Sequence, residues 1–510
     1  MKPQQMHADM SAETGTFDVL VVGGGNAALC AALSAREQGA RVLLLERAPE
    51  SERGGNSSYT EGLMRFVYNG VDDIRALCPD LTDGEVACSD FGIYTEEQFF
   101  DDMARITQNR TDPDLCEILV KDSNSAVHWL RKYGVRFMPQ FGRQAFKVDG
   151  KFKFWGGAAL AAWGGGPGLV STLYKAAEQR GIDIVYGAWV QDLVHADAGV
   201  SGVVARVHGS TRTYLAGTVV LACGGFEANA EWRSRYLGRG WDLAKVRGTK
   251  YNTGDGLAMA LRIGAQPYGH WSGCHAIGWE RYAPEFGDLS VTDDLERGSY
   301  PFGIFVNADG RRFLDEGADF RSYTYAKYGG IVLEQPGQFA WEIYDAKVLH
   351  LLRSEYRTKH VTKVRADTIE DLAAKLEDVD SEQLLKTITE FNAAVQTKIP
   401  FNPNVKDGRC ARGLAMPKSN WANTIDTPPF EAYAVTCGVT FTFGGVRVTN
   451  EAQIVNTNHE PIGGLFAAGE MVGGLFYFNY PSASGLTSGT VFGRIAGRSA
   501  ARVAREKRAA

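Results

Sequence analysis

The sequence predicts an α/β fold in which one domain, built on a parallel sheet, is interrupted by a second domain and completed by the end of the chain. Three observations support this: a strand–helix–strand pattern at 17–47, a second alternating block at 165–225, and a return to strand and helix patterns near the C-terminus. At 510 residues the chain is too long for one compact core. We therefore expect two or three domains.

The first block is a β–α–β unit. FDVLVV (17–22) is an apolar run typical of a buried parallel strand, a helical pattern follows, and RVLLLERA gives a second buried strand. The loop after the first strand reads GGGNAA (23–28), a Gly-x-Gly-x-x-Ala pattern, and Glu46 ends the next strand about twenty residues on. Such a loop places a pyrophosphate on a helix N-terminus, and the Glu46 carboxylate can accept hydrogen bonds from a ribose. The sequence thus predicts a Rossmann-like dinucleotide site.

The next segments extend this domain. Residues 95–135 have helical patterns, with a Thr-x-x-Gln cap in TEEQFFDDMARITQ and an early Pro in DPDLCEILVKDSNSAVHWLRKYG. We place a helical insert at 95–150. A further helix, LVSTLYKAAEQRG, then precedes a strand, a hairpin and another strand. These elements are expected to join the first block in one sheet.

Residues 270–435 differ in composition, with more Pro, Tyr and charge and no alternating pattern, which indicates an inserted domain. PIGGLFAAGE and SGTVFGRIAGRSAARVAREK then restore a strand and a long terminal helix. We divide the chain into a disordered N-terminus (1–14), the first part of the cofactor domain (15–268), the inserted domain (269–436) and the last part of the cofactor domain (437–510).

Composition excludes several classes of function. The net charge of -6 and the pI near 5.9 give no basic field for nucleic acid. The eight cysteines form no Cys-x-x-Cys pair, so no zinc or iron–sulfur site is expected. The N-terminal segment lacks an apolar signal region, and no apolar run approaches the roughly 20 residues that span a bilayer. A cytoplasmic protein without a transmembrane segment is expected.

Further glycine-rich loops identify the dinucleotide. GGNSSYTEG follows the strand that ends at Glu46, and YNTGDGLAMA and GGLFAAGEMVGG come much later. FAD is extended through its protein and draws on several such segments, whereas no second Gly-x-Gly-x-x-Gly loop offers itself for NAD(P)H. We expect a flavoprotein that exchanges electrons with a carrier other than NAD.

These motifs, in this order, resemble the fumarate reductase/succinate dehydrogenase flavoprotein superfamily, which also contains 3-ketosteroid dehydrogenases. The resemblance covers nearly the whole chain and rests on VVGGGNAALCAALSAREQGARVLLLE, GGNSSYTEG, VVLACGGF, NTGDGLAMALRIGA, VNADGRRFLDE, GGLFAAGE and VFGRIAG. Within it, GGNSSYTEGLMRF, GHWSGCHAIGW and DEGADFRSYTYAKYG are most similar to FAD-dependent tricarballylate dehydrogenases. The resemblance implies a Rossmann-like FAD-binding domain, discontinuous in sequence, with an inserted α+β capping domain.

The resemblance also implies the residues that contact FAD. Relatives with covalent flavin carry a His in the loop after the Glu-terminated strand, where this chain has Ser57 and Ser58, so noncovalent FAD is expected. The implied FAD contacts are Gly23, Gly25, Asn26, Ala27, Glu46, Arg47, Gly54, Gly55, Asn56, Ser57, Val190, Ala222, Gly224, Asp255, Gly469, Glu470, Ser484 and Leu486.

Catalytic candidates follow from the same resemblance. Arg321 is the counterpart of the proton-transfer Arg of fumarate reductases, one residue later than a gap-free match, and Tyr323 is the counterpart of a ketosteroid dehydrogenase Tyr. His275 falls near the position of a carboxylate-binding His. Phe441 stands where the family has a second His, and Tyr480 where fumarate reductases have a carboxylate-binding Arg. An Arg can act as a base only if it is buried and paired, so a simple carboxylate-binding role for Arg321 stays open.

Candidates for substrate binding are Arg65, His270 and Ser484, with a structural role the stronger interpretation for His270. The basic cluster Arg143, Lys147, Lys151 and Lys153 is interpreted as a solvated loop. Tyr480 either donates a hydrogen bond to substrate or packs between Phe478 and Pro481.

The predicted function is removal of two hydrogens across a C–C bond of a polycarboxylate, of the type tricarballylate to cis-aconitate. Three alternatives stay open: a 3-ketosteroid dehydrogenase, a fumarate-reductase-like C=C reductase, and a flavin redox subunit that turns over no small carbon acid. The expected partners are a small carboxylate substrate and a separate electron carrier, for which an iron–sulfur or quinone-linked membrane protein is one option. Through that carrier the protein would be peripheral to the membrane.

Overall fold

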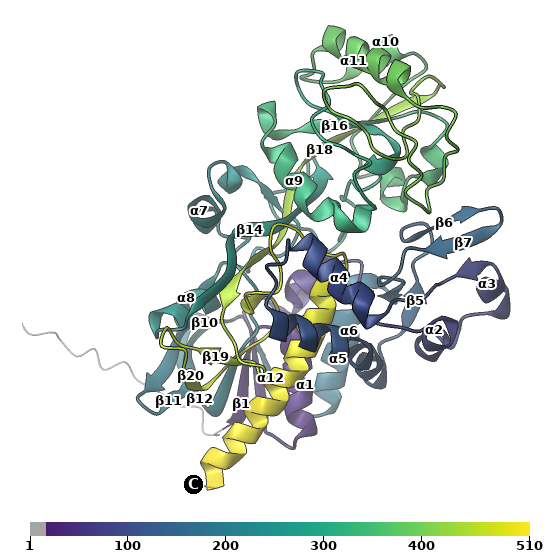
Figure 1. Cartoon of the computed structure of the whole chain (residues 1–510). Coiled ribbons are helices and arrows are strands. Elements are labelled where there is room, and N and C mark those ends of the chain that lie inside the picture. The colour runs from purple at the N-terminus through teal and green to yellow at the C-terminus, as the bar shows by residue number, and fades with distance from the viewer. Residues whose placement is uncertain (1–16, 510) are drawn as a thin grey trace, which may run out of the picture.

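The computed structural model describes residues 17–509, so the predicted disordered segment 1–14 lies outside the described residues. The chain forms two parts joined by long strands: one holds α1, α12 and β1, and the other holds α10, α11 and β16 (Figure 1). Within 17–509, no helix combines the length and apolar character needed to cross a membrane.

The largest sheet has the order β10-β11-β12-β1-β2-β9, with β20 beside β12 and β19 beside β20. Its strands are β1 (Phe17–Val22), β2 (Val42–Glu46), β9 (Asp183–Tyr186), β10 (Ala188–Ala196), β11 (Gly199–Val207), β12 (Ser210–Leu221), β19 (Gln453–Val455) and β20 (Pro461–Ala467). The first half of β12 pairs antiparallel with β11, and its second half pairs parallel with β1 and β20. The predicted α/β fold is confirmed, and the C-terminal part of the chain returns to the sheet begun by β1.

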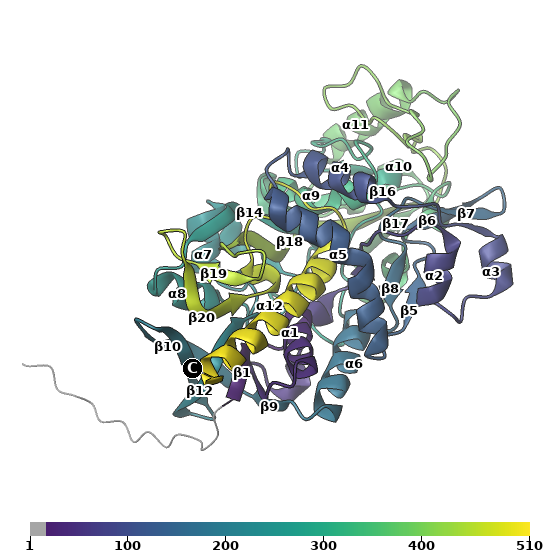
Figure 2. The same ribbon diagram turned by 60° about the horizontal axis from the view of Figure 1, so that its bottom comes forward.

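Two helices pack closely over this sheet, α1 (Asn26–Glu37) and α12 (Ser484–Ala509) (Figure 2). Gly489, Gly493 and Gly497 recur every fourth residue of α12 and so share one face. A Cβ at Gly497 would lie 2.1 Å from the Ala31 carbonyl oxygen, and one at Gly493 would lie 2.6 Å from the Ala27 carbonyl oxygen. Only glycine allows this contact, which holds the start of α12 beside the start of α1. Helix α6 (Gly165–Gln179) also packs on α1.

The segment between β2 and α6 forms two small sheets, β3-β8-β5 and β4-β7-β6, with four helices. The elements are β3 (Leu63–Met64), α2 (Val71–Leu77), α3 (Asp83–Ala87), β4 (Ser89–Asp90), α4 (Glu96–Ile106), α5 (Pro113–Lys132), β5 (Phe137–Pro139), β6 (Ala145–Val148), β7 (Lys151–Phe154) and β8 (Leu160–Ala162). The helical insert predicted at 95–150 is therefore helical only as far as Lys132. Asp149 and Gly150 have φ of 51° and 82°, the conformation of a two-residue hairpin turn, and they join β6 to β7.

The inserted region is built on a six-stranded sheet in which the 17-residue β18 pairs with β13, β14, β16 and β17. Its strands are β13 (Lys245–Val246), β14 (Pro267–Glu280), β15 (Ile304–Val306), β16 (Ala340–Tyr344), β17 (Lys363–Ala366) and β18 (Phe430–Val446). The helices α9 (Tyr325–Leu333), α10 (Ile369–Lys375) and α11 (Ser381–Ala394) lie between β15 and β18 in the sequence. The helices α7 (Ala230–Trp232) and α8 (Asp255–Arg262) precede β14. The predicted domain boundaries at 268/269 and 436/437 fall inside β14 and β18, so these two strands belong to both regions.

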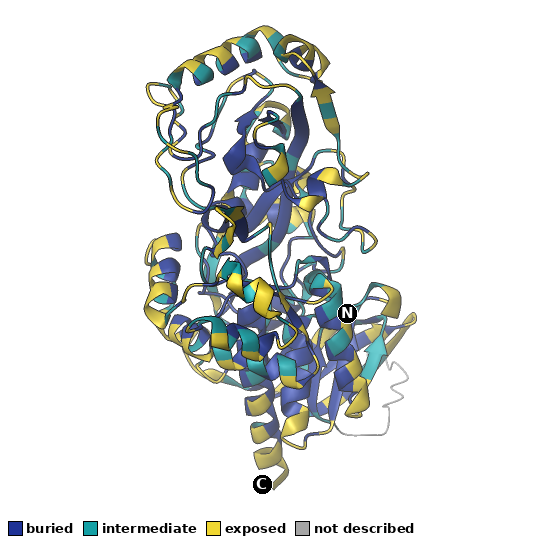
Figure 3. Ribbon diagram, turned by 90° about the vertical axis from the view of Figure 1, so that its right-hand side faces the viewer, coloured by how far each residue is buried: buried dark blue, intermediate teal, exposed yellow. Residues whose placement is uncertain are grey.

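The described residues form a main hydrophobic core that extends into the inserted region, where it includes Tyr300 and Val435, and smaller cores beside it. The main core surrounds the large sheet, and a second one, which includes Trp341, Leu384 and Phe391, lies between β16, β18 and α11. Figure 3 shows buried strands in both parts and exposed outer helices. The antiparallel pair β14 and β18 connects the two cores, and the functional cavity lies along it.

Candidate active site

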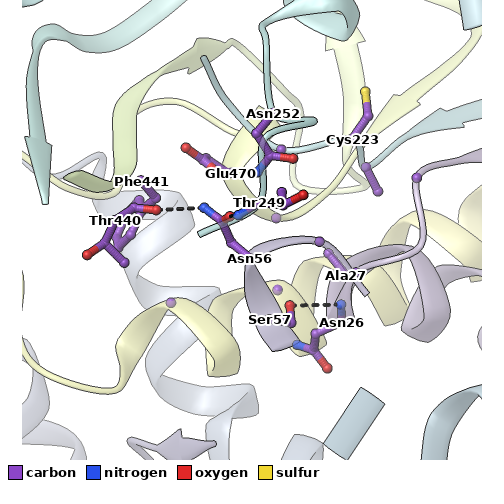
Figure 4. A pocket seen from close by; sticks show the side chains of 18 of the residues that line it. Asn26, Ala27, Asn56, Ser57, Cys223, Thr249, Asn252, Thr440, Phe441 and Glu470 are labelled. Atoms are coloured by element: carbon purple, nitrogen blue, oxygen red, sulfur yellow. Dashed lines mark hydrogen bonds between the residues drawn. The ribbon is translucent and has the colours of Figure 1, made fainter. Parts of the chain in front are cut away.

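The loop after β1 is shaped for an anionic ligand. Gly23 has a φ of 112°, and a Cβ there would lie 2.3 Å from the Ala222 carbonyl oxygen of the neighbouring strand. Gly25 caps α1 without any side-chain hydrogen bond to the first turn. The N–H groups that follow Asn26 in the first turn have no capping side chain from Gly25, and a phosphate is the usual ligand of such a helix end. Ser57 braces the loop by accepting a hydrogen bond from the Asn26 N–H at 3.0 Å (Figure 4).

One end of the cavity has the groups that a ribose and an adenine require. Glu46, the last residue of β2, accepts a hydrogen bond from the Ala48 N–H at 2.7 Å, and burial raises its pKa to about 7. The Arg47 guanidinium contacts Asp255 at 2.8 Å and lies over the Trp189 ring at 4.8 Å. This end of the cavity therefore offers the Glu46 carboxylate to ribose hydroxyls and the flat ring of Trp189 to an adenine.

The middle of the cavity is formed by the later glycine-rich loops. Asn56, in the short helix Gly55–Tyr59, donates to the Thr440 carbonyl oxygen at 2.7 Å, and Glu470 accepts from the Thr442 N–H at 2.6 Å (Figure 4). Gly469 lies against Ala27, since a Cβ there would be 2.7 Å from the Ala27 Cβ. Four segments distant in sequence, around Ala27, Asn56, Thr440 and Glu470, therefore meet at one cavity.

This cavity has a volume of about 240 Å³ and runs from the glycine loop after β1 to Tyr480. All the predicted FAD contacts line it except two. Gly54 has a φ of 108° and lies against Ser58, and the Ser484 hydroxyl turns back to the Pro481 carbonyl oxygen at 2.8 Å. The helix end, the Glu46 carboxylate and the extended cradle all fit FAD. Cys223 also lines the cavity. Burial raises the pKa of its thiol to about 12, so this thiol does not offer a thiolate nucleophile as an alternative to flavin chemistry.

Beyond Glu470 the cavity ends in what we call the arginine–aromatic compartment, formed by Arg247, His275, Glu296, Arg321, Tyr325, Phe441, Phe476 and Tyr480. Arg321, in the short helix Arg321–Tyr323, forms an ion pair with Glu296, and its guanidinium lies 4.6 Å from the centre of the Tyr325 ring. Burial, and then the neighbouring Arg353, lower the pKa of Arg321 well below its ordinary value. The neutral form of this side chain is therefore less costly than in water.

Arg321 belongs to a buried network of alternating charges. Arg353 pairs with Glu61, Glu296 and Glu355, and Arg143 pairs with Glu355 at 2.9 Å. The carboxylates of Glu61, Asp293 and Glu296 lie within 4.8 Å of one another, and each faces at least one of these guanidinium groups. The predicted solvated role of Arg143 is wrong, because its side chain is only 15% exposed and ion-paired.

The opposite wall of the compartment is aromatic. His275 stacks on Phe441 with ring centres 5.2 Å apart and meets Tyr480 edge-on at 4.9 Å. Neither His275 ring nitrogen has a hydrogen-bond partner among the described residues. Burial, then Arg247 and Arg321, lower the pKa of His275 well below its ordinary value, so the ring is neutral. The Gly485 N–H donates to the Tyr480 hydroxyl oxygen at 2.9 Å, which leaves the Tyr480 O–H free to donate.

Besides Gly54 and Ser484, three predicted site residues lie outside the cavity. Tyr323 and Arg65 both bind Asp102, the tyrosine through its hydroxyl at 2.7 Å and the arginine at 3.2 Å. Both lie behind the compartment, because Arg65 also donates to the Ser482 carbonyl oxygen at 2.8 Å. His270 accepts a hydrogen bond from the Phe478 N–H at 3.0 Å. The buried Asp102 carboxylate explains the position of the first two side chains. The hydrogen bond from Phe478 and the stacking on Tyr477 explain the position of His270.

Sequence reasoning missed several residues that line the cavity: Trp189, Arg247, Asn252, Glu296, Tyr325 and Thr440. A signal existed for two of them. Asn252 lies inside the YNTGDG motif, and Tyr325 is two residues after the expected Tyr323. Arg247 and Glu296 come from stretches without a motif, and only the pairing of β13 and β14 with β18 brings them near Arg321.

Comparison with known proteins agrees with this geometry. The model of the FAD binding domain family (FAD_binding_2) matches residues 18–486. A probable fumarate reductase, Ifc3, of Shewanella frigidimarina is 32% identical over 96% of this chain and 76% of its own length. The 4-oxocyclohex-2-ene-1-carboxylate 5-dehydrogenase of Sinomonas cyclohexanicum is 26% identical over 98% of this chain and 96% of its own length. The open conformation of a flavocytochrome c3 fumarate reductase aligns with a TM-score of 0.73 and 28% identity, covering 98% of this chain and 79% of that one.

The fold and the cavity define an FAD-dependent oxidoreductase. More particularly, the chain belongs to the FAD binding domain family represented by the fumarate reductase flavoproteins, whose members act on C=C or CH–CH groups. FAD as cofactor and an enzymatic role, both predicted from the sequence, are thereby confirmed.

Proposed function

We propose that this enzyme interconverts a C–C single bond and a C=C double bond in a ring-bearing acid that carries one carboxylate. The observation that supports this is the arginine–aromatic compartment itself. Among the described residues that line it, the cationic wall holds Arg247 and Arg321, and the facing wall is formed by Phe441, Phe476 and Tyr480. One end of such a site suits an anion and the other suits a flat apolar body.

Arg321 is the proposed proton-transfer group. FAD, when bound, supplies the two-electron chemistry by exchanging a hydride with one carbon of the bond. The neighbouring carbon must then lose or gain one proton, so that two hydrogens in all are exchanged. Burial and the neighbouring Arg353 lower the pKa of Arg321 and so make a neutral guanidine more accessible. Glu296, its ion-pair partner, fixes the position of the side chain. The neutral His275 beside it has a free nitrogen to accept or donate a hydrogen bond at the carboxylate.

A single carboxylate is favoured over the tricarboxylate expected from the sequence. Three substrate carboxylates would need several donors to offset their desolvation. Phe441 and Tyr480 occupy the positions where the resemblance led us to expect His and Arg, and both rings pack against other aromatics. In addition, the four guanidinium groups near Glu296 are matched by four carboxylates. This balance leaves little excess positive charge for a trianion.

The Tyr480 O–H can donate a hydrogen bond to the substrate. This supports a substrate with a second acceptor besides its carboxylate, such as a ring ketone. This observation keeps the 3-ketosteroid alternative open, because that substrate has a ketone and no carboxylate. The name of the Sinomonas relative combines a ring ketone with one carboxylate, which is the combination that Tyr480 and Arg321 would bind. Electrons would pass to or from a separate carrier, as proposed from the sequence.

Anaerobic titration of the FAD-loaded enzyme tests the proposal. We expect 4-oxocyclohexane-1-carboxylate to bleach the oxidised flavin, or its unsaturated analogue to reoxidise the reduced flavin. Tricarballylate, fumarate and a 3-ketosteroid should do neither. Arg321→Met should abolish the reaction, whereas Arg262→Met, which removes an exposed arginine paired with Asp192, should not. Reaction with tricarballylate alone would restore the polycarboxylate hypothesis, and reaction with the 3-ketosteroid alone would select the steroid alternative.

Tyr480→Phe separates the two binding roles. Loss of the hydroxyl should lower kcat/KM for the oxo acid by about 10- to 100-fold, since a buried hydrogen bond to substrate is lost. The same variant should leave reaction with a ring acid that lacks the ketone within about 3-fold of the unmodified enzyme. Equal losses for both acids would mean that Tyr480 only shapes the wall.

A further inference from the structure

A second buried carboxyl group lies behind the cofactor cavity. Glu227 is fully buried and does not line the cavity itself. Its Oε1 accepts hydrogen bonds from Asn56 Nδ2 at 2.5 Å and from Asn252 Nδ2 at 2.6 Å. Both asparagines line the cavity, so Glu227 sets the orientation of two amides that face the cofactor.

The other oxygen of Glu227 has an unusual neighbour. Oε2 receives no hydrogen bond from any N–H or O–H group of residues 17–509, and the Glu470 carboxyl lies within hydrogen-bonding reach of the Glu227 side chain. Glu470 is itself fixed, since its Oε1 accepts from the Thr442 N–H at 2.6 Å and from the Thr442 hydroxyl at 3.0 Å. Two carboxylates can approach in this way only if a proton lies between them.

The charges around the pair agree with a single negative charge. Arg233 is a buried cation near the pair, and it donates to the backbone carbonyl oxygens of Glu227 at 2.5 Å and of Trp241 at 2.8 Å. Titratable neighbours on β14 and β18 include Cys274 and Cys437, and burial raises the pKa of both thiols. Among the described residues, the hydrogen bonds of Arg233 all go to backbone carbonyl oxygens, so this cation does not compensate a second negative charge on the pair by direct contact.

We propose that Glu227 is a protonated positioning residue of the FAD site, whose O–H donates a hydrogen bond to the Glu470 carboxylate and which holds Asn56 and Asn252 in place. Glu470 then stays a carboxylate, directed into the middle of the cavity beside Gly469. Burial, followed by repulsion from Glu470, raises the pKa of Glu227 well above its ordinary value, in agreement with this assignment.

The assignment predicts that glutamine can replace Glu227. The amide of Glu227→Gln would still accept both asparagine N–H groups on its oxygen and donate an N–H to Glu470. Alanine would leave the two asparagine amides and the Glu470 carboxylate without their partners, which is costly for buried groups. If Glu227 were ionised instead, Glu227→Gln would place an N–H where an anion is needed and would behave like alanine.

The experiment measures FAD affinity of the apoprotein by flavin fluorescence, which needs no substrate and is independent of the proposed reaction. We expect Glu227→Gln to bind FAD within about 3-fold of the unmodified protein and Glu227→Ala to bind about 30-fold or more weakly. Glu231→Gln removes an exposed carboxylate from the same segment, paired only with Arg235 among the described residues, and serves as the control. Equal weakening by glutamine and alanine would overturn the proposal.

Infrared spectroscopy gives a readout that a merely structural role would not change. At pH 7 the difference spectrum between the unmodified protein and Glu227→Gln should contain the carbonyl band of one buried protonated carboxylic acid, because Glu46 and Glu342 contribute equally to both proteins. The FAD affinity of the unmodified protein should also fall at alkaline pH relative to Glu227→Gln, because loss of the shared proton leaves two adjacent anions. Glu46 titrates at the other end of the cavity in both proteins, so the ratio isolates Glu227. Identical spectra and a constant ratio would refute the assignment even if Glu227→Ala does not fold.

Discussion

At the scale of single residues, the neighbours of a side chain decide whether it takes part in chemistry. Tyr323 and Tyr325 are two residues apart and both buried, yet they face different groups. The Tyr323 hydroxyl donates to Asp102, whereas the Tyr325 ring lines the compartment under the Arg321 guanidinium. The residue chosen from the sequence is therefore next to the one that the fold directs into the cavity.

Replacing each tyrosine by phenylalanine tests this distinction. Tyr323→Phe removes one of the donors to a buried carboxylate and should lower the free energy of unfolding by about 1–3 kcal/mol, with kcat changed less than about 2-fold. Tyr325→Phe should lower kcat with little loss of stability, because the Tyr325 side chain lines the compartment beside Arg321. Chemical denaturation and steady-state kinetics of both variants give the comparison. A large loss of kcat in Tyr323→Phe would return Tyr323 to the list of catalytic residues.

A second residue-scale prediction concerns pH. Glu342 on β16 is fully buried, and the hydroxyls of Tyr344 and Tyr356 donate to its Oε2 at 2.8 and 2.5 Å. Burial raises its pKa from 4.5 to about 7. The folded state therefore holds the Glu342 proton more tightly than the unfolded state does. The contribution of this proton to the stability of the folded state is complete below pH 4.5 and is lost as the pH rises through 7.

The substitution Glu342→Gln removes the ionisable carboxyl group and with it the expected dependence of stability on pH. Between pH 5 and 8 the stability of the unmodified protein relative to Glu342→Gln should fall by roughly 3 kcal/mol. Glu370→Gln, which removes an exposed carboxylate from α10 of the same region, is the control and should show no such trend. Denaturant titrations at several pH values provide the measurement. A difference that does not vary with pH would mean that Glu342 is ionised throughout.

At the scale of elements, two glycines in the loop between β1 and α1 have different roles, one in folding and one in ligand binding. Gly23 requires a positive φ and lies against the Ala222 carbonyl oxygen, so any side chain there disturbs the junction of β1 and β12. Gly25 has a φ of -78°, and a Cβ would come no nearer than 3.5 Å to the protein. Its missing side chain therefore matters only for the approach of a ligand.

Gly25→Ala should consequently leave the apoprotein stable to within about 1 kcal/mol. FAD affinity should fall by about 100-fold, because the added methyl group occupies the position of the pyrophosphate. Thermal unfolding of the apoprotein and fluorescence titration with FAD measure the two effects separately. Gly23→Ala is the matched comparison and should reduce both. Unchanged FAD binding by Gly25→Ala would place the pyrophosphate elsewhere.

Elements with a local signal could be predicted from the sequence, and those that depend on distant pairing could not. The β1–α1–β2 unit carries its apolar runs and its glycine loop within 30 residues, and the structure has it as expected. The hairpin of β6 and β7 was missed although Asp149-Gly150 is a turn signal, because the preceding helical pattern was extended too far. In the site, the motif-bearing residues were found, whereas Arg247 and Glu296 depend on how β13 and β14 pair with β18.

At the scale of the whole molecule, β14 and β18 make the two regions one mechanical unit. β18 pairs with β16 and β17 at its first residues and with β14 along most of its length, and it then ends beside the cofactor loops. The residues of the compartment come from both regions, with Arg321 and Tyr325 on one side and Phe476 and Tyr480 on the other. A closed site therefore requires that the regions keep their relative position.

This continuity leads to a prediction for unfolding. Because β18 belongs to both cores, we expect one cooperative thermal transition for residues of the FAD domain and of the inserted region, rather than two. FAD at 100 times its dissociation constant should stabilise the folded protein by about 2.7 kcal/mol and shift that single transition as a whole. Hydrogen exchange of the backbone amides of β16 in the inserted region and of β1 in the FAD domain, followed through the transition, should report the same midpoint. Two midpoints, with only that of β1 shifted by FAD, would show that the inserted region unfolds independently of the cofactor domain.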